Sequence, residues 1–183
     1  MTDRKNGLTI TYLLNSGFLV KGDGWGLLFD DFQDPTGAVD QALPEMEELY
    51  IFVSHAHFDH FSPEIARYAA HTRRYFLSRD IAGVPSAKRI PAHQVTWLGV
   101  YDRCDADRIR VISYDSTDEG TSFAVEIAGW RIFHAGDFNW WHWQEDTAEN
   151  IGFARNGFMK QMKQLDGASF DLAFFPADGR LGE

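Results

Sequence analysis

The stretch of residues 51–64 constrains the fold of this chain more than any other part. A run of apolar residues leads directly into His55, His57, Asp59 and His60, which brings three imidazoles and a carboxylate close together. Neutral imidazole nitrogen and carboxylate oxygen are ligands for zinc, manganese and iron, and open sites built from them activate water. A histidine-rich surface loop is the alternative. The density of these donors favours a metal site.

The same residues indicate where such a site would lie in a fold. Alternate residues of an extended loop point to the same side, which lets His55 and His57 share one face. Asp59 and His60 lie past the bend and can serve a second metal position. Ser62 suits the N-cap of a following helix. A ligand-bearing loop at the carboxyl end of a strand is typical of layered α/β folds, so we expect this architecture.

The composition fits one globular domain that acts on a small molecule. The chain has 183 residues, of which 44% are hydrophobic, so a single domain over residues 1–183 with a sizeable core is expected. The formal net charge of -10 argues against a nucleic-acid surface, which needs clustered Lys and Arg. A small-molecule substrate is therefore the expected partner.

Cysteine content and hydropathy narrow the kind of metal site and the compartment. Cys104 is the only cysteine, which excludes an internal disulfide and a cysteine-based zinc site. Residues 1–7 lead into a strand without the long apolar segment of an export signal. No run reaches the roughly 20 apolar residues of a membrane span. We therefore expect a cytoplasmic protein that does not bind membranes.

Hydrophobic patterning predicts many short strands and few helices. Strands are expected over residues 8–14, 17–21, 27–29, 49–53, 75–77, 94–98, 109–114, 122–127, 130–134 and 172–175. Turn residues at 21–26 predict a hairpin, and the strands within residues 109–134 are expected to pair antiparallel. The strands at 49–53 and 172–175 are expected to be buried. Helical segments are expected as a short turn over residues 45–48, after Ser62, and over residues 147–165.

A second pair of candidate ligands follows a later strand, in the sequence His134-Ala-Gly-Asp137. The glycine lets the backbone turn the Asp137 carboxylate inward. The histidine-rich loop, followed about 80 residues later by this Gly-Asp pair, resembles the metallo-β-lactamase superfamily, as do Asn15–Phe18 and Leu28–Asp30. The resemblance implies an α/β fold, a four-layer αββα sandwich with its site at the rim between two β-sheets.

The resemblance also assigns metal-binding roles to five residues. It implies that His55 and His57 bind a first metal ion and that Asp59 and His60 bind a second. Asp137 would bridge the two ions. A hydroxide held between cations about 3.5–4 Å apart is a ready nucleophile, and Asp59 is also expected to accept a proton during catalysis. Zinc is the first candidate for the one or two divalent ions, and manganese or iron are the alternatives.

The chain departs from the superfamily pattern at two places. The superfamily usually has a metal-binding histidine in the loop before a strand pair, but residues 115–120 contain none. Asp118 or Glu119 can replace it as an oxygen ligand, which favours manganese or iron, and a solvated turn is the alternative. A histidine near the C-terminus is also expected, yet none follows His142. Either the chain is shortened at its C-terminus or its second metal position is incomplete.

Residues after Asp137 suggest contacts with a substrate. Trp140 and Trp141 can wall a pocket for an apolar or ring-bearing molecule, with core packing as the alternative. Arg180 can hold a carboxylate or phosphate through its planar guanidinium, with a simple exposed charge as the alternative. His134 is expected to support the neighbouring ligands and not to bind metal itself.

These features predict a metal-dependent hydrolase. A metal-activated water is expected to attack an ester, lactone or phosphoester of a small molecule. Two alternatives stay open: an iron-dependent oxidoreductase of the same fold, and a catalytically incomplete scaffold that binds metal without turnover. A homo-oligomer in which a partner subunit completes the site is also compatible with the missing histidines.

Overall fold

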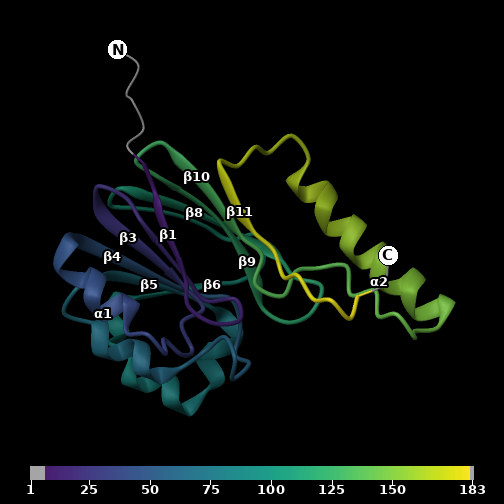
Figure 1. Ribbon diagram of the computed structural model, residues 1–183, viewed down its shortest axis with the longest axis horizontal. Coiled ribbons are helices and arrows are strands. Elements are labelled where there is room, and N and C mark those ends of the chain that lie inside the picture. The colour runs from purple at the N-terminus through teal and green to yellow at the C-terminus, as the bar shows by residue number, and fades with distance from the viewer. Residues whose placement is uncertain (1–6, 182–183) are drawn as a thin grey trace. The chain divides into compact units, whose positions relative to one another are not determined.

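The structure is a computed structural model that describes residues 7–181 (Figure 1). The chain divides into two compact units, Met1–Gly99 and Val100–Glu183. Each unit is built on one β-sheet. The expectation of one domain over residues 1–183 stays a prediction, because compact units of this kind occur both within one domain and as separate domains.

The first unit contains a six-stranded mixed sheet in the order β1-β2-β3-β4-β5-β6. Its strands are β1 (Thr9–Tyr12), β2 (Phe18–Lys21), β3 (Gly24–Phe29), β4 (Met46–Val53), β5 (Thr72–Ser78) and β6 (Val95–Leu98). The pairs β1/β2 and β2/β3 are antiparallel, and the remaining neighbours are parallel. The antiparallel pairing of β2 with β3 confirms the hairpin predicted at residues 21–26.

Short helices lie along one face of this sheet (Figure 1). They are α1 (Ala38–Ala42) and the 3-10 helices η1 (Leu43–Glu45), η2 (Pro63–Tyr68), η3 (Arg79–Gly83), η4 (Pro85–Arg89) and η5 (Ala92–Gln94). Val39, Ile65 and Ile81 from these helices are buried in the core that covers the face. The Ser62 side chain accepts a hydrogen bond from Glu64 N at 3.2 Å, which confirms the predicted helix cap.

The other face of this sheet carries a row of stacked aromatic rings. Phe29, Phe52 and Phe76 come from β3, β4 and β5, are fully buried, and have neighbouring ring centroids 4.9 Å apart. Full burial of one such side chain contributes roughly 1.5–3 kcal/mol, so the three rings stabilise the pairing of these strands. Their register aligns the carboxyl ends of three parallel strands at one edge of the sheet.

The second unit contains a five-stranded sheet in the order β11-β10-β9-β8-β7. Its elements are β7 (Arg103–Ala106), β8 (Ile109–Asp115), β9 (Thr121–Ile127), β10 (Trp130–His134), α2 (Ala148–Met162), η6 (Lys163–Leu165) and β11 (Leu172–Phe174). The antiparallel set predicted within residues 109–134 is confirmed, and β11 pairs with β10 in parallel. Phe158 of α2 and Leu165 of η6 pack with Phe133 and Phe138.

Two sequence predictions are wrong in this fold. The helical turn expected over residues 45–48 ends at Glu45, because Met46 is extended and pairs with Gly24 of β3. Pairing with a neighbouring strand outweighs the local turn preference there. The strand at 172–175 forms as β11, but Leu172 and Phe174 are only partly buried and Ala173 is exposed. As an edge strand, β11 has β10 as its single neighbour in the sheet.

The strand β7 was not predicted from the sequence. β7 carries charged side chains without apolar alternation, so its strand conformation depends on pairing with β8. Among residues 7–181, none of the helices combines the length and apolar character needed to cross a lipid bilayer.

Candidate metal centre

The parallel strands β3, β4 and β5 end at the same edge of the first sheet. Asp30 follows β3, Ser54 and His55 follow β4, and Asp80 lies just past β5 in η3. Because the carboxyl ends of parallel strands gather at one edge, side chains from distant parts of the sequence meet there. The edge holds the histidine-rich loop together with the side chains that orient it.

Asp30 is the buried centre of this arrangement. Its backbone is left-handed, with φ 43, and the residue is 1% exposed. Oδ1 accepts a hydrogen bond from Ser54 N at 2.7 Å, and Oδ2 accepts one from the Ser54 hydroxyl at 2.7 Å. Oδ2 also lies 2.8 Å from His60 Nδ1. One carboxylate therefore fixes both the start of the loop and its last histidine.

These contacts determine where the imidazole protons lie. Because Asp30 accepts from His60 Nδ1, the proton is on Nδ1, which makes Nε2 the nitrogen of His60 that can act as a metal ligand. The Ser54 hydroxyl hydrogen points to Asp30, so the hydroxyl oxygen accepts from His55 Nδ1, 3.0 Å away. In a neutral imidazole, this arrangement places the lone pair of His55 on Nε2. Both imidazoles are held in the tautomer that binds metal.

His55 and His57 meet as the alternation of the loop predicts. His55 Nε2 lies 3.0 Å from His57 Nδ1. Two imidazole nitrogens at this separation share a proton or a cation, because two facing lone pairs repel each other. His55 is buried and His57 is exposed. An anchored inner donor beside an accessible outer donor fits a metal ion with an open coordination position.

Backbone hydrogen bonds hold the loop in a tight turn. His60 N and Phe61 N both donate to His57 O, at 3.0 and 2.9 Å. Ala56 N donates to the Asp80 carboxylate at 2.8 Å. The loop that carries the imidazoles is thus fixed at its start and at its bend.

Asp59, the predicted catalytic residue, is partly buried beside Asn15. Asn15 Nδ2 donates to Asp59 Oδ2 at 3.5 Å. Asn15 has φ 49 and lies in a turn closed by the hydrogen bond from Leu13 N to Gly17 O at 2.9 Å. The Asn15–Phe18 motif therefore supplies a polar side chain to the same edge as the histidine-rich loop.

The second sheet has an acidic edge of its own. β8, β10 and β11 run in one direction, so their carboxyl ends lie at the same edge. Asp118 follows β8 and Asp137 follows β10, and their carboxylate oxygens lie within 4.8 Å of each other. Asp118 and Glu119 are exposed, whereas Asp137 is partly buried. This edge offers a pair of oxygen donors for a cation.

Thr117 connects the two loops that carry these acids. Its hydroxyl donates to Asn139 O at 2.6 Å and accepts from Asn139 N at 2.9 Å. Asn139 Nδ2 in turn donates to Pro176 O at 3.2 Å. The loops after β8, β10 and β11 are fastened to one another through these contacts.

His134 ends β10 and supports the turn before Asp137. Its side chain is buried, and Gly136 N donates to His134 Nδ1 at 3.2 Å. Gly136 has φ 55, a conformation that favours glycine and permits the sharp turn. These contacts agree with the supporting role expected for His134.

Trp141 and Arg180 both make internal contacts. Trp141 Nε1 donates to Asp137 O at 3.0 Å, and its ring stacks on Trp143 with centroids 5.7 Å apart. Arg180 lies over the Trp143 ring at 5.2 Å. Hydrogen bonds from Arg180 to the partly buried Asp178 carboxylate lower the pKa of that group to about 2. Trp141 thus braces the Asp137 turn, and the Arg180 guanidinium is paired.

Trp140 lies between His142 and Phe158 of α2, with ring centroids 5.7 and 6.4 Å away. Its Nε1 is buried and has no hydrogen-bond partner within residues 7–181. Trp140 therefore packs against the helix with one face of its ring.

The sequence does not predict the orienting roles of Asp30, Ser54, Asp80 and Thr117. Asp30 could have been found from the sequence, because it is an acidic residue directly after a strand. Such a residue lies next to the ligands if that strand and the strand before the ligand loop are parallel neighbours. Nothing in the sequence indicates the role of Thr117. Its contact with Asn139 depends on the loops after β8 and β10 lying at the same edge of the sheet.

Comparison with known proteins agrees with the fold and the family suggested by the sequence. Residues 9–149 match the beta-lactamase superfamily domain. A UPF0173 metal-dependent hydrolase of Symbiobacterium thermophilum is 28% identical over 135 residues, which cover 71% of this chain and 60% of that protein. The chain thus spans about three fifths of the length of the curated relative it matches.

Solved structures show the same fold. A metallo-beta-lactamase from Staphylococcus aureus is similar with a TM-score of 0.58 and 13% identity, over 96% of this chain and 57% of that one. CmlA, a diiron beta-hydroxylase from Streptomyces venezuelae, is similar with a TM-score of 0.55 and 13% identity, over 74% of this chain and 30% of that one. Together with the domain match, this α/β fold shows that the chain belongs to the metallo-β-lactamase superfamily.

Proposed function

We propose that this protein is a metal-dependent hydrolase that directs a metal-activated water at an ester, lactone or phosphoester of a small molecule. The observation that carries the proposal is the His55–His57 pair, whose nitrogens lie 3.0 Å apart. Ser54 and Asp30 hold the His55 proton on the nitrogen that faces away from His57. The similarity to the Symbiobacterium protein, which is named a metal-dependent hydrolase, supports the same activity.

The donor set fits one or two divalent ions. We propose that His55 and His57 would hold the first ion and that Asp59 and His60 would hold the second, with Asp137 as the further carboxylate ligand that the superfamily pattern implies. Three imidazoles with carboxylates make zinc the first candidate. When bound, such an ion supplies Lewis acidity and lowers the pKa of water toward neutrality.

We propose that Asp118 adds an oxygen donor in the loop where the superfamily usually has a histidine. Its carboxylate lies within 4.8 Å of the Asp137 carboxylate, which supports a shared cation at this edge. Replacing a nitrogen donor with oxygen raises the preference for manganese or iron relative to zinc.

The remaining residues would handle the proton and the substrate. Asp59 accepts a proton during the reaction, with its carboxylate oriented by Asn15. Trp140 and Trp141 would contact a substrate with the parts of their rings that their stacking partners leave uncovered. Arg180 binds a substrate carboxylate or phosphate, which replaces the Asp178 carboxylate as the partner of the guanidinium.

The test compares metal-free protein with protein reloaded with Zn²⁺, Mn²⁺ or Fe²⁺ on a panel of p-nitrophenyl esters, lactones and phosphodiesters. We expect hydrolysis only after reloading, and a loss of more than about 100-fold in His57→Ala. His71→Ala is the matched control, because His71 is exposed and lies before β5, at the opposite edge of the same sheet. Hydrolysis that survives chelation, or equal losses in both variants, would contradict the proposal.

An iron-dependent oxidoreductase is the second candidate. The structural likeness to a diiron beta-hydroxylase favours it, as do the neighbouring oxygen donors Asp118 and Asp137. Aerobically purified protein would then contain iron, absorb visible light and consume oxygen when given a reductant. A colourless protein that hydrolyses a panel substrate and consumes no oxygen excludes this candidate. Metal binding without either activity would leave a metal-binding scaffold.

A further inference from the structure

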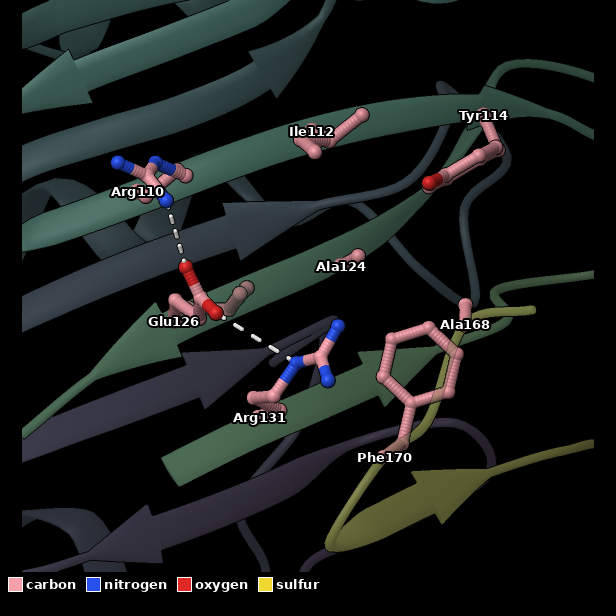
Figure 2. A pocket seen from close by; sticks show the side chains of 9 residues that line it. Arg110, Ile112, Tyr114, Ala124, Glu126, Arg131, Ala168 and Phe170 are labelled. Carbon is pink, nitrogen blue, oxygen red and sulfur yellow. Dashed lines mark hydrogen bonds and ion pairs between the residues drawn. The ribbon is translucent and has the colours of Figure 1, made fainter. Parts of the chain in front are cut away.

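A hollow of about 180 Å³ lies on one face of the five-stranded sheet, within the second unit (Figure 2). Its lining comes from β8, β9 and β10 and from the segment before β11. Charged side chains stand at one end, and Tyr114 and Phe170 stand at the other (Figure 2). Nothing in the proposed metal chemistry uses these residues.

The strand register explains why the sheet is hollow at this point. Ala124 of β9 pairs with Ile112 of β8 on one side and with Phe133 of β10 on the other. Side chains in one such row stand on the same face of the sheet. The small Ala124 methyl group between the larger Ile112 and Phe133 side chains leaves space above the sheet. Tyr114 and Phe170 form the walls of that space. The floor and walls of the hollow are therefore apolar.

The neighbouring row across the strands is charged and contains Asp105, Arg110, Glu126 and Arg131, of which all but Asp105 line the hollow. Glu126 pairs across the strands with both Arg110 and Arg131. Arg110 Nη1 donates to Glu126 at 3.0 Å, and Arg131 Nε lies 3.5 Å from the same carboxylate. Two guanidiniums thus share the one carboxylate that lines the hollow. Arg110 has a further partner, Asp105, which lies outside the lining.

The Arg131 guanidinium has N–H groups that can donate to a ligand at the charged end of the hollow. Its Nη1 donates to Ser169 Oγ at 2.7 Å, and its Nε faces Glu126. Its Nη2 makes no hydrogen bond within the part of the chain that the structure describes. Arg131 is 45% exposed at its side chain, so an incoming anion reaches the guanidinium without displacing protein atoms.

We propose that this hollow binds a small ring-bearing carboxylate. The ring would lie on Ala124 between Tyr114 and Phe170, with the carboxylate against Arg131. The size agrees, because an apolar cavity of about 150 Å³ accepts a benzene ring. Planar guanidinium suits a carboxylate, and Tyr114 offers a hydroxyl to a polar ring substituent. The alternative is a charge ladder that only stabilises strand pairing.

The test follows backbone amide shifts of the ¹⁵N-labelled full chain during titration with phenylacetate. We expect saturable shifts at Ala124 and Phe170 with a dissociation constant of roughly 1 mM. Benzyl alcohol has the ring without the charge, and acetate has the charge without the ring. Both are expected to bind at least tenfold more weakly. Shifts that never saturate, or benzyl alcohol binding as well as phenylacetate, would overturn the proposal.

Two variants test the two ends of the hollow independently. Ala124→Leu fills the space above the sheet at a partly buried position, and Arg131→Gln removes the charge while keeping a donor. Each is expected to weaken phenylacetate binding at least tenfold, and Arg131→Lys only about threefold. Arg155→Gln, on the exposed side of α2, is the matched control and should bind as the wild type does. Wild-type binding in Arg131→Gln contradicts the proposal even if Ala124→Leu fails to fold.

Discussion

Asp30 shows at the scale of one residue how the histidine-rich loop becomes a set of ligands. Its buried carboxylate accepts from Ser54 and fixes the His60 proton on Nδ1. The Ser54 hydroxyl oxygen in turn accepts a hydrogen bond from His55 Nδ1, which orients the His55 ring. Without Asp30, the loop has the same imidazoles but lacks the carboxylate that orients Ser54 and His60.

Asp30→Asn tests this role. The amide keeps the size of the side chain but has one acceptor oxygen, so it cannot serve all the donors that Asp30 serves. Metal affinity is expected to fall about 10- to 100-fold, the range for partners that orient ligands. Competition with a chromophoric chelator measures it. Asp166→Asn, at an exposed carboxylate, is the control. Unchanged metal affinity in Asp30→Asn would show that the hydrogen bonds to Asp30 do not contribute to metal binding.

Asp31 has a different effect, on stability. Burial, and next the Asp34 carboxylate, raises the pKa of Asp31 from 3.8 to about 6, and the residue is 6% exposed. The folded protein therefore binds this proton more tightly than the unfolded chain does. Stability contributed by the protonated form is present at low pH and is lost as the pH rises from about 4 to about 6.

Asp31→Asn should remove that loss. A shift of about two pKa units corresponds to about 3 kcal/mol, so the free energy of unfolding should exceed the wild-type value by up to that amount above pH 6. Below about pH 4 the two proteins should be equally stable. Urea denaturation across this pH range measures the difference. An Asn variant that is equally stable or less stable at pH 7.5 would contradict the pKa assignment.

At the scale of elements, the two sheets present chemistry at the carboxyl ends of their strands. In the first unit the ends of β3, β4 and β5 bring together imidazoles and the acids that orient them. In the second unit the ends of β8 and β10 bring together Asp118 and Asp137. The Thr117–Asn139 contacts fasten those two loops.

Thr117→Val tests whether this fastening matters for the acid pair. Valine keeps the shape but removes the hydroxyl that both donates to and accepts from the Asn139 backbone. Mn²⁺ affinity is expected to fall about tenfold, while Thr117→Ser retains it. Titration followed by Mn²⁺ paramagnetic resonance gives the affinity of each variant. A Val variant that binds like the wild type, or a Ser variant as weak as Val, would rule out a positioning role.

Much of the fold is predictable because its signals are local. The apolar run at residues 49–53 and the turn residues at 21–26 identify strands and a hairpin without knowledge of their neighbours. β7 and residues 46–48 are not predictable in this way, because pairing with another strand creates them. Sheet order is a property of distant segments, so local patterns miss it.

The same distinction applies to the site. His55 and His57 are visible from spacing alone, whereas the partner of His60 lies 30 residues away. Which carboxylate meets which imidazole depends on β3 and β4 being parallel neighbours. Ligands can therefore be predicted from the sequence, and the residues that orient them require the fold.

At the scale of the whole molecule, the chain combines the superfamily domain over residues 9–149 with a net charge of -10. Part of that charge lies in candidate ligands, which a divalent cation would neutralise. The hollow over Ala124 is a separate feature of the second unit, with Arg110 and Arg131 at one end. The proposed cation site and the proposed anion site therefore use different residues, and each proposal can fail without the other.

Calorimetric titration of the metal-free chain with Zn²⁺ measures whether the histidine-rich loop binds metal. We expect uptake of one or two ions by the wild type and by His71→Ala. We expect the loss of at least one tight site in His57→Ala, because His57 Nδ1 faces His55 Nε2 at 3.0 Å. A wild-type chain that takes up no metal, or a His57→Ala variant with unchanged stoichiometry and affinity, would contradict metal binding by the histidine pair.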